Sequence, residues 1–485
     1  MSASAPIVVQ RLEPVPDPAD AAERCADLPL LLLLDSTADH ERTGRYSFLM
    51  ADPYRVVRTR GDAASLTTVR DALAPFRSAP LAGLPPFQGG AAGFIGYDWG
   101  ATLERLPVPR HDDLALPDVL LGLYDWVVAW DHCERAAWIV STGMPDEGVG
   151  RAERALARAA LIAARLAVKP TRALAGPLRS KAPAPGNEAA TRPAACPSYP
   201  VLGVDDAEQI ELRSTFTHRG YLSAVARVRE YILAGDIFQA NLSQRFEAPL
   251  REAPWTLYRR LRTMNPAAFG AYMDCGDFQV LSVSPERFLR LSGAQVETRP
   301  IKGTRPRGLG PMHDAMLGQV LAESDKDRAE NVMIVDLLRN DLSRVCRPGS
   351  VRVPELFSLE HHPTVHHLVS TVVGELEQGA DAVALVRATF PGGSITGAPK
   401  VRAMEIIAEM EPTRRGVYCG SLGYLGANGE MDTSIAIRTC VARGNRVYFQ
   451  AGGGIVADSD PEQEYRETLD KARGIVRTLA HRPTT

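Results

Sequence analysis

A proline- and alanine-rich segment divides the chain and most constrains how it can fold. Residues 169–200 contain seven prolines, many alanines and almost no large apolar side chains, a composition typical of a linker outside any packed core. We therefore predict an N-terminal region over 1–168, a linker over 169–205 and a second domain over 206–480. A chain of 485 residues is also too long for one simple core, which agrees with this division.

Charge and cysteine content narrow the class of function. The chain has 55 basic and 58 acidic residues and a net charge of -3. Its overall charge therefore does not attract nucleic acid or an anionic membrane, and chemistry on a small molecule is favoured. Its seven cysteines form no C-x-x-C pair, as expected of reduced thiols. The N-terminus lacks a signal-peptide pattern, and the longest apolar run, 28–34, is too short to span a bilayer. We expect a soluble, cytoplasmic protein.

The stretch 284–307, SPERFLRLSGAQVETRPIKGTRPR, is where we expect the chemistry. Strand-like residues at 287–291 and 294–298 flank Ser292-Gly293, which predicts a hairpin with a two-residue turn. The hairpin would bring Glu286 near Lys302, and a carboxyl group beside a deprotonated amine can serve as proton donor and nucleophile. A simple ladder would place these two side chains on opposite faces, and a surface hairpin with a solvated basic end remains the alternative. The arginines expected to lower the pKa of Lys302 are Arg299, Arg305 and Arg307.

Several other segments have clear patterns. The runs 120–130 and 431–441 are each strand-like throughout. Helices are predicted over 323–338, with Asp327 and Glu330 one turn apart, and over 461–479, where Glu464, Glu467 and Lys471 share a stripe; a solvated helix face is the alternative for each. Three glycines, 452–454, follow a predicted strand and would let backbone approach a ligand closely.

Long blocks of the sequence resemble the chorismate-utilising enzymes, a family that includes anthranilate synthase component I, aminodeoxychorismate synthase component I, isochorismate synthase and salicylate synthase. Between 216 and 476 the blocks include SPERF, TRPIKGTRPRG, MIVDLLRNDLSRVC, GSITGAPKVRAMEII and AGGGIVADSDPEQEYRETLDKA. RYSFLMADP and PPFQGGAAGFIGYD resemble the N-terminal region of the first two enzymes. The resemblance implies an α+β fold with α/β/β/α layers and orthogonally packed, mostly antiparallel sheets.

The resemblance also assigns residue roles. Lys302 lies in PIKGT, the form typical of aminodeoxychorismate synthases, where it matches the nucleophile; anthranilate synthases usually have PIAGT. Glu286 matches the general acid, and Gln239 stands where isochorismate and salicylate synthases have a lysine that activates water. The residues matching the Mg²⁺ site are the ligands Glu330 and Glu467 and the supporting Asp327 and Glu464; anthranilate synthases have glutamate in place of Asp327. The residues matching substrate contacts are Gln239, His367, Ser394, Tyr424, Arg438, Gly453, Gly454 and Lys471.

The activity implied is conversion of chorismate and ammonia to 4-amino-4-deoxychorismate, for p-aminobenzoate and folate synthesis. The resemblance implies Mg²⁺ as cofactor and a separate glutamine amidotransferase subunit as the ammonia source. Anthranilate synthase component I, which forms anthranilate and pyruvate, is the first alternative, and a catalytically silent subunit that activates an amidotransferase is the second. Anthranilate synthases hold feedback tryptophan near an L-L-E-S motif; here residues 33–36 are L-L-D-S, and we predict no strong feedback inhibition.

Overall fold

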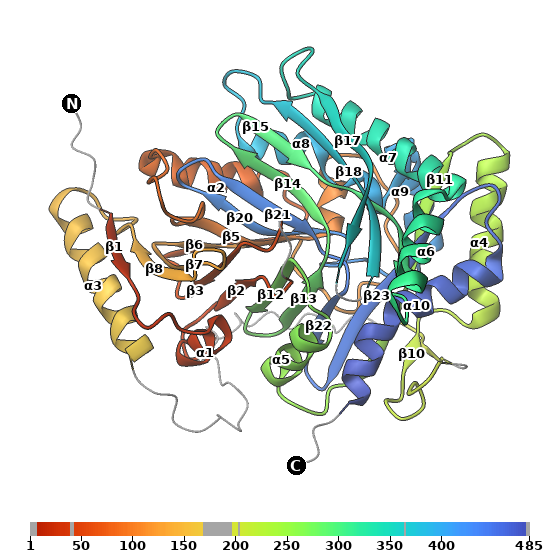
Figure 1. Ribbon diagram of the computed structural model, residues 1–485, viewed down its shortest axis with the longest axis horizontal. Coiled ribbons are helices and arrows are strands. Elements are labelled where there is room, and N and C mark those ends of the chain that lie inside the picture. Colours follow the sequence, from red (N-terminus) through yellow and green to blue (C-terminus); the bar gives the residue numbers. More distant parts are fainter. Residues whose placement is uncertain (1–6, 39–42, 168–195, 202–203, 363–364, 482–485) are drawn as a thin grey trace.

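The computed structural model describes residues 7–38, 43–167, 196–201, 204–362 and 365–481. Most of the predicted linker lies outside these residues. Two large antiparallel sheets are stacked between two layers of helices (Figure 1). The predicted α+β fold with α/β/β/α layers is confirmed. No helix in the described part of the chain is long and apolar enough to cross a membrane.

The first sheet takes strands from both sides of the linker. Its central pairing joins β2 to β12, where Leu33 lies opposite Tyr272. The strand order is β1 (Val8–Arg11), β8 (Ala136–Ser141), β7 (Trp126–Asp131), β3 (Tyr46–Met50), β2 (Leu32–Asp35), β12 (Phe269–Asp274), β13 (Gln279–Ser284), β22 (Thr439–Arg443), β23 (Arg446–Ile455), β11 (Gln239–Pro249), β10 (Arg213–Ser214) and β9 (Tyr199–Pro200), with β19 (Gly397–Ala398) paired to β11.

The second sheet is also shared. Here β5 pairs with β20, so that Gly93 lies opposite Gly423. The strand order is β16 (Ile301–Pro306), β18 (Val365–Glu375), β15 (Gln295–Thr298), β14 (Arg287–Ser292), β21 (Met431–Ile435), β20 (Ser421–Gly426), β5 (Gly90–Ile95), β6 (Val119–Tyr124) and β4 (Arg55–Thr59), with β17 (Arg352–His361) paired to β18. The segments before and after the linker therefore both contribute strands to each sheet. The division into domains at 168 and 206 stays a prediction.

Four apolar clusters are buried among the described residues, and one of them packs α4 and α9 against the β11 and β23 end of the first sheet. The other three hold the layers together. One lies between the sheets, one joins the first sheet to its helices, and one joins the second sheet to its helices. The helices on the first sheet are α1 (Pro18–Arg24), α3 (Gly148–Ala167), α5 (Pro254–Met264) and α10 (Pro461–Ala480), and those on the second are α2 (Ser65–Leu73), α7 (Asp325–Ser343) and α8 (Ala382–Thr389). The remaining helices are α4 (His218–Leu233), α6 (Pro311–Ala322), α9 (Lys400–Met410) and the short 3-10 turns η1 (Ala74–Phe76), η2 (Tyr97–Thr102) and η3 (Gly393–Ile395).

The chain passes directly from one sheet to the other at several points. The predicted single strand 120–130 breaks at Asp125, between β6 and β7, and the predicted single strand 431–441 breaks between β21 and β22. Both predictions were wrong because an apolar run does not reveal that its two halves pair in different sheets. Arg438, in the second break, has the left-handed φ of 49° that such a bend can require.

Two of these crossings lie side by side. The chain crosses at Glu286, between β13 and β14, next to the crossing between β21 and β22. The Ile435 amide donates to the Glu286 carbonyl at 3.0 Å, and the Val283 amide donates to the Arg438 carbonyl at 3.1 Å. The backbone therefore holds Glu286 and Arg438 between the sheets.

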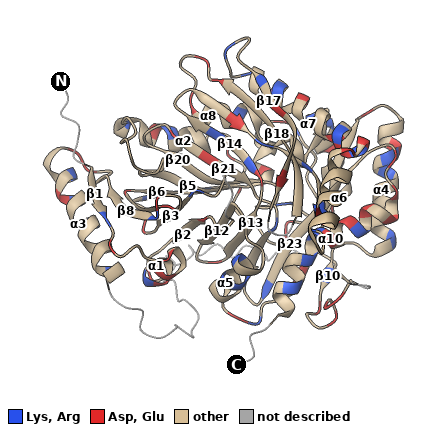
Figure 2. Ribbon diagram, viewed as in Figure 1, with Lys and Arg blue, Asp and Glu red and all other residues tan. Residues whose placement is uncertain are grey.

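Elsewhere, acidic and basic residues are interspersed over the visible ribbon (Figure 2).

Candidate active site

The predicted hairpin forms, but its turn is one residue further along the chain. Ser292 lies opposite Gln295, so the two connecting residues are Gly293 and Ala294. Gly293 has a φ of 58°, and glycine at the first central position is what a type II′ turn requires. The predicted turn at Ser292-Gly293 was therefore wrong. Glu286 does not pair with Arg299, because the ladder between β14 and β15 covers only 290–292 and 295–297.

Lys302 reaches the site through a break in strand pairing. β15 and β16 both pair with β18, and the register shifts between Ile301 and Thr304. Gly303, inside this shift, has a φ of 82°, which a residue with a side chain adopts only at a cost. Lys302 Nζ donates to the Ser394 carbonyl at 3.3 Å. The irregular backbone thus places the amine beside the turn η3.

The pKa of Lys302 is lowered, as predicted, but not by the arginines. Burial of the ammonium is the main cause, the charge of Lys471 adds to it, and nearby glutamates oppose it. Each of the three arginines is instead bound to a carboxylate. These ion pairs are Arg299 with Glu360, Arg305 with Asp327, and Arg307 with Asp314. The sequence shows the cluster of positive charge. It does not show that carboxylates from other segments pair with these arginines.

Glu286 is poised to hold a proton near neutral pH. Glu286 is 4% exposed to solvent. Burial raises the pKa of Glu286 from 4.5 to about 7, against the lowering effects of a hydrogen bond from Ser394 and the charge of Lys302. A carboxyl group with such a pKa can donate a proton to a leaving group at physiological pH. Sequence reasoning paired Lys302 with Glu286, and the charge of each affects the pKa of the other.

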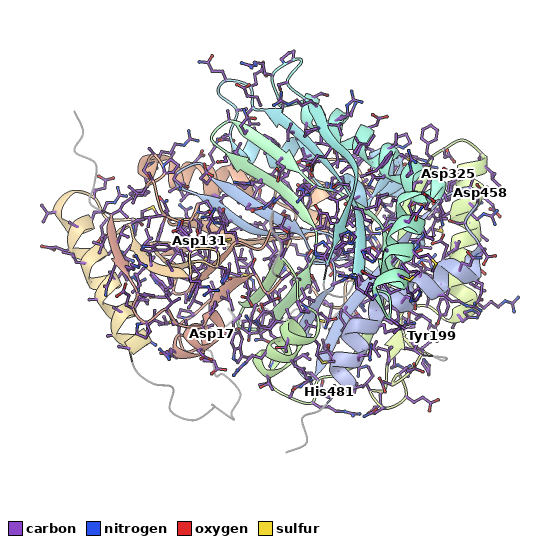
Figure 3. All side chains as sticks on the ribbon, viewed as in Figure 1. Asp17, Asp131, Tyr199, Asp325, Asp458 and His481 are labelled. Carbon is purple, nitrogen blue, oxygen red and sulfur yellow. The ribbon has the colours of Figure 1, made fainter. Side chains whose placement is uncertain are left out.

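The acidic side chains come from the first two turns of two helices. Ser324 caps α7, and Asp460 caps α10 with Pro461 at its first position, the start signals expected for helices. The two helices begin near each other, since Lys326 Nζ lies 4.0 Å from Glu330 and 3.8 Å from Glu464. Figure 3 labels Asp325 and Asp458 at these two helix starts.

The protonation of these glutamates follows from their surroundings. Burial, with repulsion from other carboxylates, raises the pKa of Glu330 and of Glu464. Burial also works against ionisation of Glu467, but Lys471 outweighs it and lowers that pKa. Lys471 Nζ donates to Glu467 at 2.6 Å and to the Gly452 carbonyl at 2.8 Å. The acidic cluster therefore attracts cations.

The triple glycine brings the backbone against this cluster. Gly453 and Gly454 lie inside β23, not after it as predicted. A Cβ on Gly453 would lie 3.0 Å from Glu464 Oε2 and 3.1 Å from Glu467 Oε1, and one on Gly454 would lie 2.2 Å from Gln239 Nε2. Only glycine permits the second approach without a shift of the neighbouring side chain. This backbone joins Gln239 to the two glutamates of α10.

The donor set suits a hard cation such as Mg²⁺. Glu464 Oε1 accepts a hydrogen bond from Ser459 at 2.6 Å, while the buried Oε2 has no hydrogen-bond partner. Carboxylate oxygens are the ligands that Mg²⁺ prefers. Within the described ranges, however, no three acidic, histidine or cysteine side chains already converge as in an assembled metal centre. The Oδ2 oxygen of Asp327 accepts from Arg305 at 2.8 Å, which leaves Oδ1 as its oxygen for a cation.

Two further predicted residues flank the site. His367 is 2% exposed and its Nδ1 lies 2.9 Å from Thr304 Oγ1. Burial, with the charge of Arg438, holds the pKa of His367 well below its usual value, so the imidazole is neutral. Arg438 has no carboxylate partner among the residues that the structure describes, and burial lowers its pKa. A guanidinium in this condition can receive an anionic ligand group.

Tyr424 is the one predicted substrate contact that the structure places elsewhere. It packs between the sheets against Phe48 and Phe87, with ring centroids 5.4 and 4.6 Å apart. There it lines a cavity of about 270 Å³ together with Asp35. The predicted contact is therefore not supported, because alternate residues of a strand face opposite sides of a sheet. Asp35, from the L-L-D-S motif, accepts a hydrogen bond from Arg262 at 2.6 Å. The absence of strong tryptophan inhibition stays a prediction.

Sequence reasoning missed several residues that the structure places at the site. Lys326 lies one turn before Glu330 and could have been found by its i,i+4 spacing. Ser459, which binds Glu464, comes from the loop before α10. The buried pair Glu411 and Arg415, which contacts the turn η3 through Ile395, also has i,i+4 spacing, but it lies beyond the end of α9 at Met410, where helical spacing does not apply.

Together, an amine with a lowered pKa, a carboxyl group with a raised pKa and a nearby acidic cluster are the groups that an enzyme site would need for acid–base and nucleophilic chemistry. The sequence profile described as chorismate binding enzyme matches residues 31–477. The chain therefore belongs to the chorismate binding enzyme family, as the resemblance in its sequence implied.

Curated relatives and solved structures agree with this assignment. The chain is 43% identical over 469 residues to aminodeoxychorismate synthase component 1 of Salmonella typhimurium (strain LT2), covering 93% of each chain. It is 40% identical to anthranilate synthase component 1 of Cereibacter sphaeroides, covering 92% of this chain and 88% of the relative. The crystal structure of anthranilate synthase component I from Streptococcus pneumoniae superposes with a TM-score of 0.72 at 29% identity, covering 90% of this chain and 94% of the other.

Proposed function

We propose that this chain aminates chorismate, forming 4-amino-4-deoxychorismate from chorismate and ammonia as the first component of an aminodeoxychorismate synthase. The observation that carries the proposal is the pair formed by Lys302 and Glu286. Burial lowers the pKa of the amine and raises the pKa of the carboxyl group, which favours the neutral form of each. Relatives with this name at 43 and 40% identity support the same activity.

The proposed reaction has two displacement steps. In the first, neutral Lys302 attacks C2 of chorismate, a C–N bond forms there, the ring double bonds shift, and the C4 hydroxyl leaves as water with a proton from Glu286. In the second, ammonia forms a bond to C4, the double bonds shift back and the bond between C2 and Lys302 breaks. The ammonium proton returns to Glu286, so the enzyme is restored and the sum is chorismate plus ammonia to product plus water.

The remaining predicted residues fit binding of a dicarboxylate. Arg438 and Lys471 supply positive charge for the substrate carboxylates. Gln239 offers an amide and not the base that activation of water would require. We propose that Glu330, Glu467 and Glu464, with support from Asp327, hold Mg²⁺. When bound, the cation would neutralise a ring carboxylate and fix its orientation.

The proposal includes a partner and a compartment. Relatives at about 40% identity are named component 1, which supports a second subunit, and we propose a glutamine amidotransferase that supplies ammonia. The reaction would be a transaminase-class amination in the cytoplasm, on the route to p-aminobenzoate and folate. The seven described cysteines are all free thiols, as expected in a reducing compartment.

Anthranilate synthase component I is the second candidate, favoured by the similarity to relatives of that name. Product analysis separates the two. The purified chain is incubated with chorismate, Mg²⁺ and ammonium, and the products are separated by liquid chromatography before and after addition of an aminodeoxychorismate lyase. We expect p-aminobenzoate only after the lyase is added. Anthranilate and pyruvate without the lyase would refute the proposal.

The Lys302→Ala variant tests the remaining alternative, a subunit without its own chemistry. A nucleophile's removal should lower turnover by orders of magnitude, with chorismate affinity measured separately by calorimetry. Arg307→Ala is the matched control, because Arg307 is an exposed residue of the same stretch whose guanidinium binds Asp314. Equal activity of Lys302→Ala and the parent would show that Lys302 takes no part in the reaction.

A further inference from the structure

The turn η3 touches both reactive groups. The Ser394 carbonyl accepts from Lys302 Nζ at 3.3 Å, and the Ser394 side chain is hydrogen-bonded to Glu286. The turn is short, three residues, and its own backbone bonds are few. Its position must therefore be fixed by neighbouring elements, and this position sets how the amine and the carboxyl group face the substrate.

A buried guanidinium also binds this turn, at the residue after Ser394. Arg415 is 4% exposed, and its Nη1 donates to the carbonyl of Ile395, the residue after Ser394, at 2.9 Å. Its Nη2 donates to the Asn241 carbonyl at 2.6 Å. Its Nε and Nη2 donate to the two carboxylate oxygens of Glu411 at 2.9 and 2.7 Å. The guanidinium also lies over the ring of Tyr97, 4.5 Å from its centroid.

We propose that Arg415 is a positioning residue for the reaction, which acts through the Ile395 carbonyl to hold Ser394 against Lys302 and Glu286. The inference rests on the proposed function for the chemistry it serves, but its geometry involves none of the predicted metal ligands. Arg415 ties three elements to one point: the strand β11 through Asn241, the end of α9 through Glu411, and η3 through Ile395.

Further hydrogen bonds connect the turn to the same strand. Asn241 Nδ2 also donates to the Ile395 carbonyl, at 3.3 Å, and the Asn241 amide donates to the Thr396 carbonyl at 2.7 Å. Glu411 is in turn fixed by Ser243, whose amide and hydroxyl both donate to it at 2.8 Å. Hydrogen bonds thus fix the position of the turn relative to β11, the strand that also carries Gln239.

Stability alone is a weak reason for such a pair. Buried ion pairs are costly to desolvate, and well-packed apolar groups of similar volume often stabilise a protein as much. What an apolar group cannot supply is a set of directed donors. The guanidinium is planar with five N–H groups in fixed directions, whereas a lysine ammonium at the same place is a point charge on a flexible stem. Arg415→Lys therefore keeps the charge and loses the geometry.

The test is a thermodynamic cycle between Arg415→Lys and Ser394→Ala, with the full chain, chorismate, Mg²⁺ and ammonium. The hydrogen bond from Ser394 lowers the pKa of Glu286, so its loss in Ser394→Ala should raise that pKa. The limb of the pH–rate profile near pH 7 should then move to higher pH. If Arg415 acts through Ser394, Arg415→Lys moves the same limb in the same direction, and the double variant moves it no further than Ser394→Ala alone.

The turnover pattern gives a second readout. We expect Arg415→Lys to lower kcat at least tenfold while KM for chorismate changes less than about threefold, because misplacement of reacting groups costs turnover first. Arg414→Lys is the matched control: Arg414 is the preceding residue and faces Asp98, Asp112 and Asp118 at 3.3–3.4 Å. This control should match the parent in kcat and in pH profile.

The outcomes separate the inference from the proposed function. A parent chain that forms no aminated product would refute the proposed function whatever Arg415 does. With an active parent, an unchanged kcat and pH limb in Arg415→Lys, or shifts that add fully in the double variant, would refute the positioning role. If Arg415→Lys does not fold, Glu411→Gln replaces it, since it keeps the volume and removes the acceptor of the Nε bond; an unchanged pH limb there would equally overturn the inference.

Discussion

Replacing Glu286 by glutamine should make the protein more stable above neutral pH and almost inactive. Glutamine keeps the size of the side chain and cannot ionise. In the folded protein, burial raises the pKa of Glu286 from 4.5 to about 7, so the folded state binds this proton more tightly than the unfolded state does. A raised carboxyl pKa means that its contribution to stability is fully present below pH 4.5 and is lost as the pH rises to 7.

The size of the effect follows from the same shift. A change of about 2.5 pKa units corresponds to about 3.5 kcal/mol at about 1.4 kcal/mol per unit. A chain of 485 residues has an unfolding entropy of roughly 1 kcal/mol/K at about 2 cal/mol/K per residue. The Tm of Glu286→Gln should therefore exceed that of the parent by about 3.5 °C at pH 9, and by less than about 1 °C at pH 5.

Thermal unfolding followed by circular dichroism at pH 5, 7 and 9 measures this difference. Glu208→Gln is the control, since Glu208 is exposed, and its Tm should differ from the parent equally at all three values. In the amination assay, Glu286→Gln should lose about 10² to 10⁴ in kcat, the range for removal of a general acid. A Tm difference independent of pH, or one that favours the parent at pH 9, would show that Glu286 is not held protonated by burial.

Three further predictions concern the other parts of the site. Lys302→Arg should be as inactive as Lys302→Ala in the lyase-coupled assay, because a guanidinium does not lose its proton; substantial activity would exclude a nucleophilic amine. Gly454→Ala should raise KM for chorismate at least tenfold, because its Cβ would lie 2.2 Å from Gln239 Nε2, while Gly150→Ala, in open space on α3, serves as the steady-state kinetic control. Glu464→Gln should weaken Mg²⁺ binding at least tenfold by isothermal calorimetry, because it removes the charge beside the unpartnered oxygen; an unchanged Kd would remove Glu464 from the cation site.

The elements with strong local patterns were predictable from the sequence. The helices at 323–338 and 461–479 form with one-turn spacing of their glutamates, because caps and periodicity are local properties. The hairpin after Glu286 also forms, displaced by one residue because the left-handed position belongs to Gly293. Its turn residue is visible in the sequence, but the choice between two adjacent registers is decided by packing of the strands.

The parts that could not be predicted depend on contacts between distant segments. The carboxylates that pair with Arg299 and Arg307 come from 360 and 314, so the charge around Lys302 could not be counted from its own stretch. Tyr424 faces the space between the sheets, although family resemblance assigned it to the substrate. The breaks at Asp125 and before Arg438 occur where strand-like composition continues, since composition does not state which sheet a strand joins.

Interleaving of the two segments within both sheets limits how the molecule can be divided. A polypeptide that began at residue 206 would lack the partners of β12 and β20, namely β2 and β5. It would present two open strand edges to other molecules, a common cause of aggregation. Cutting the chain at residue 206 would therefore remove strands from both sheets that frame the site.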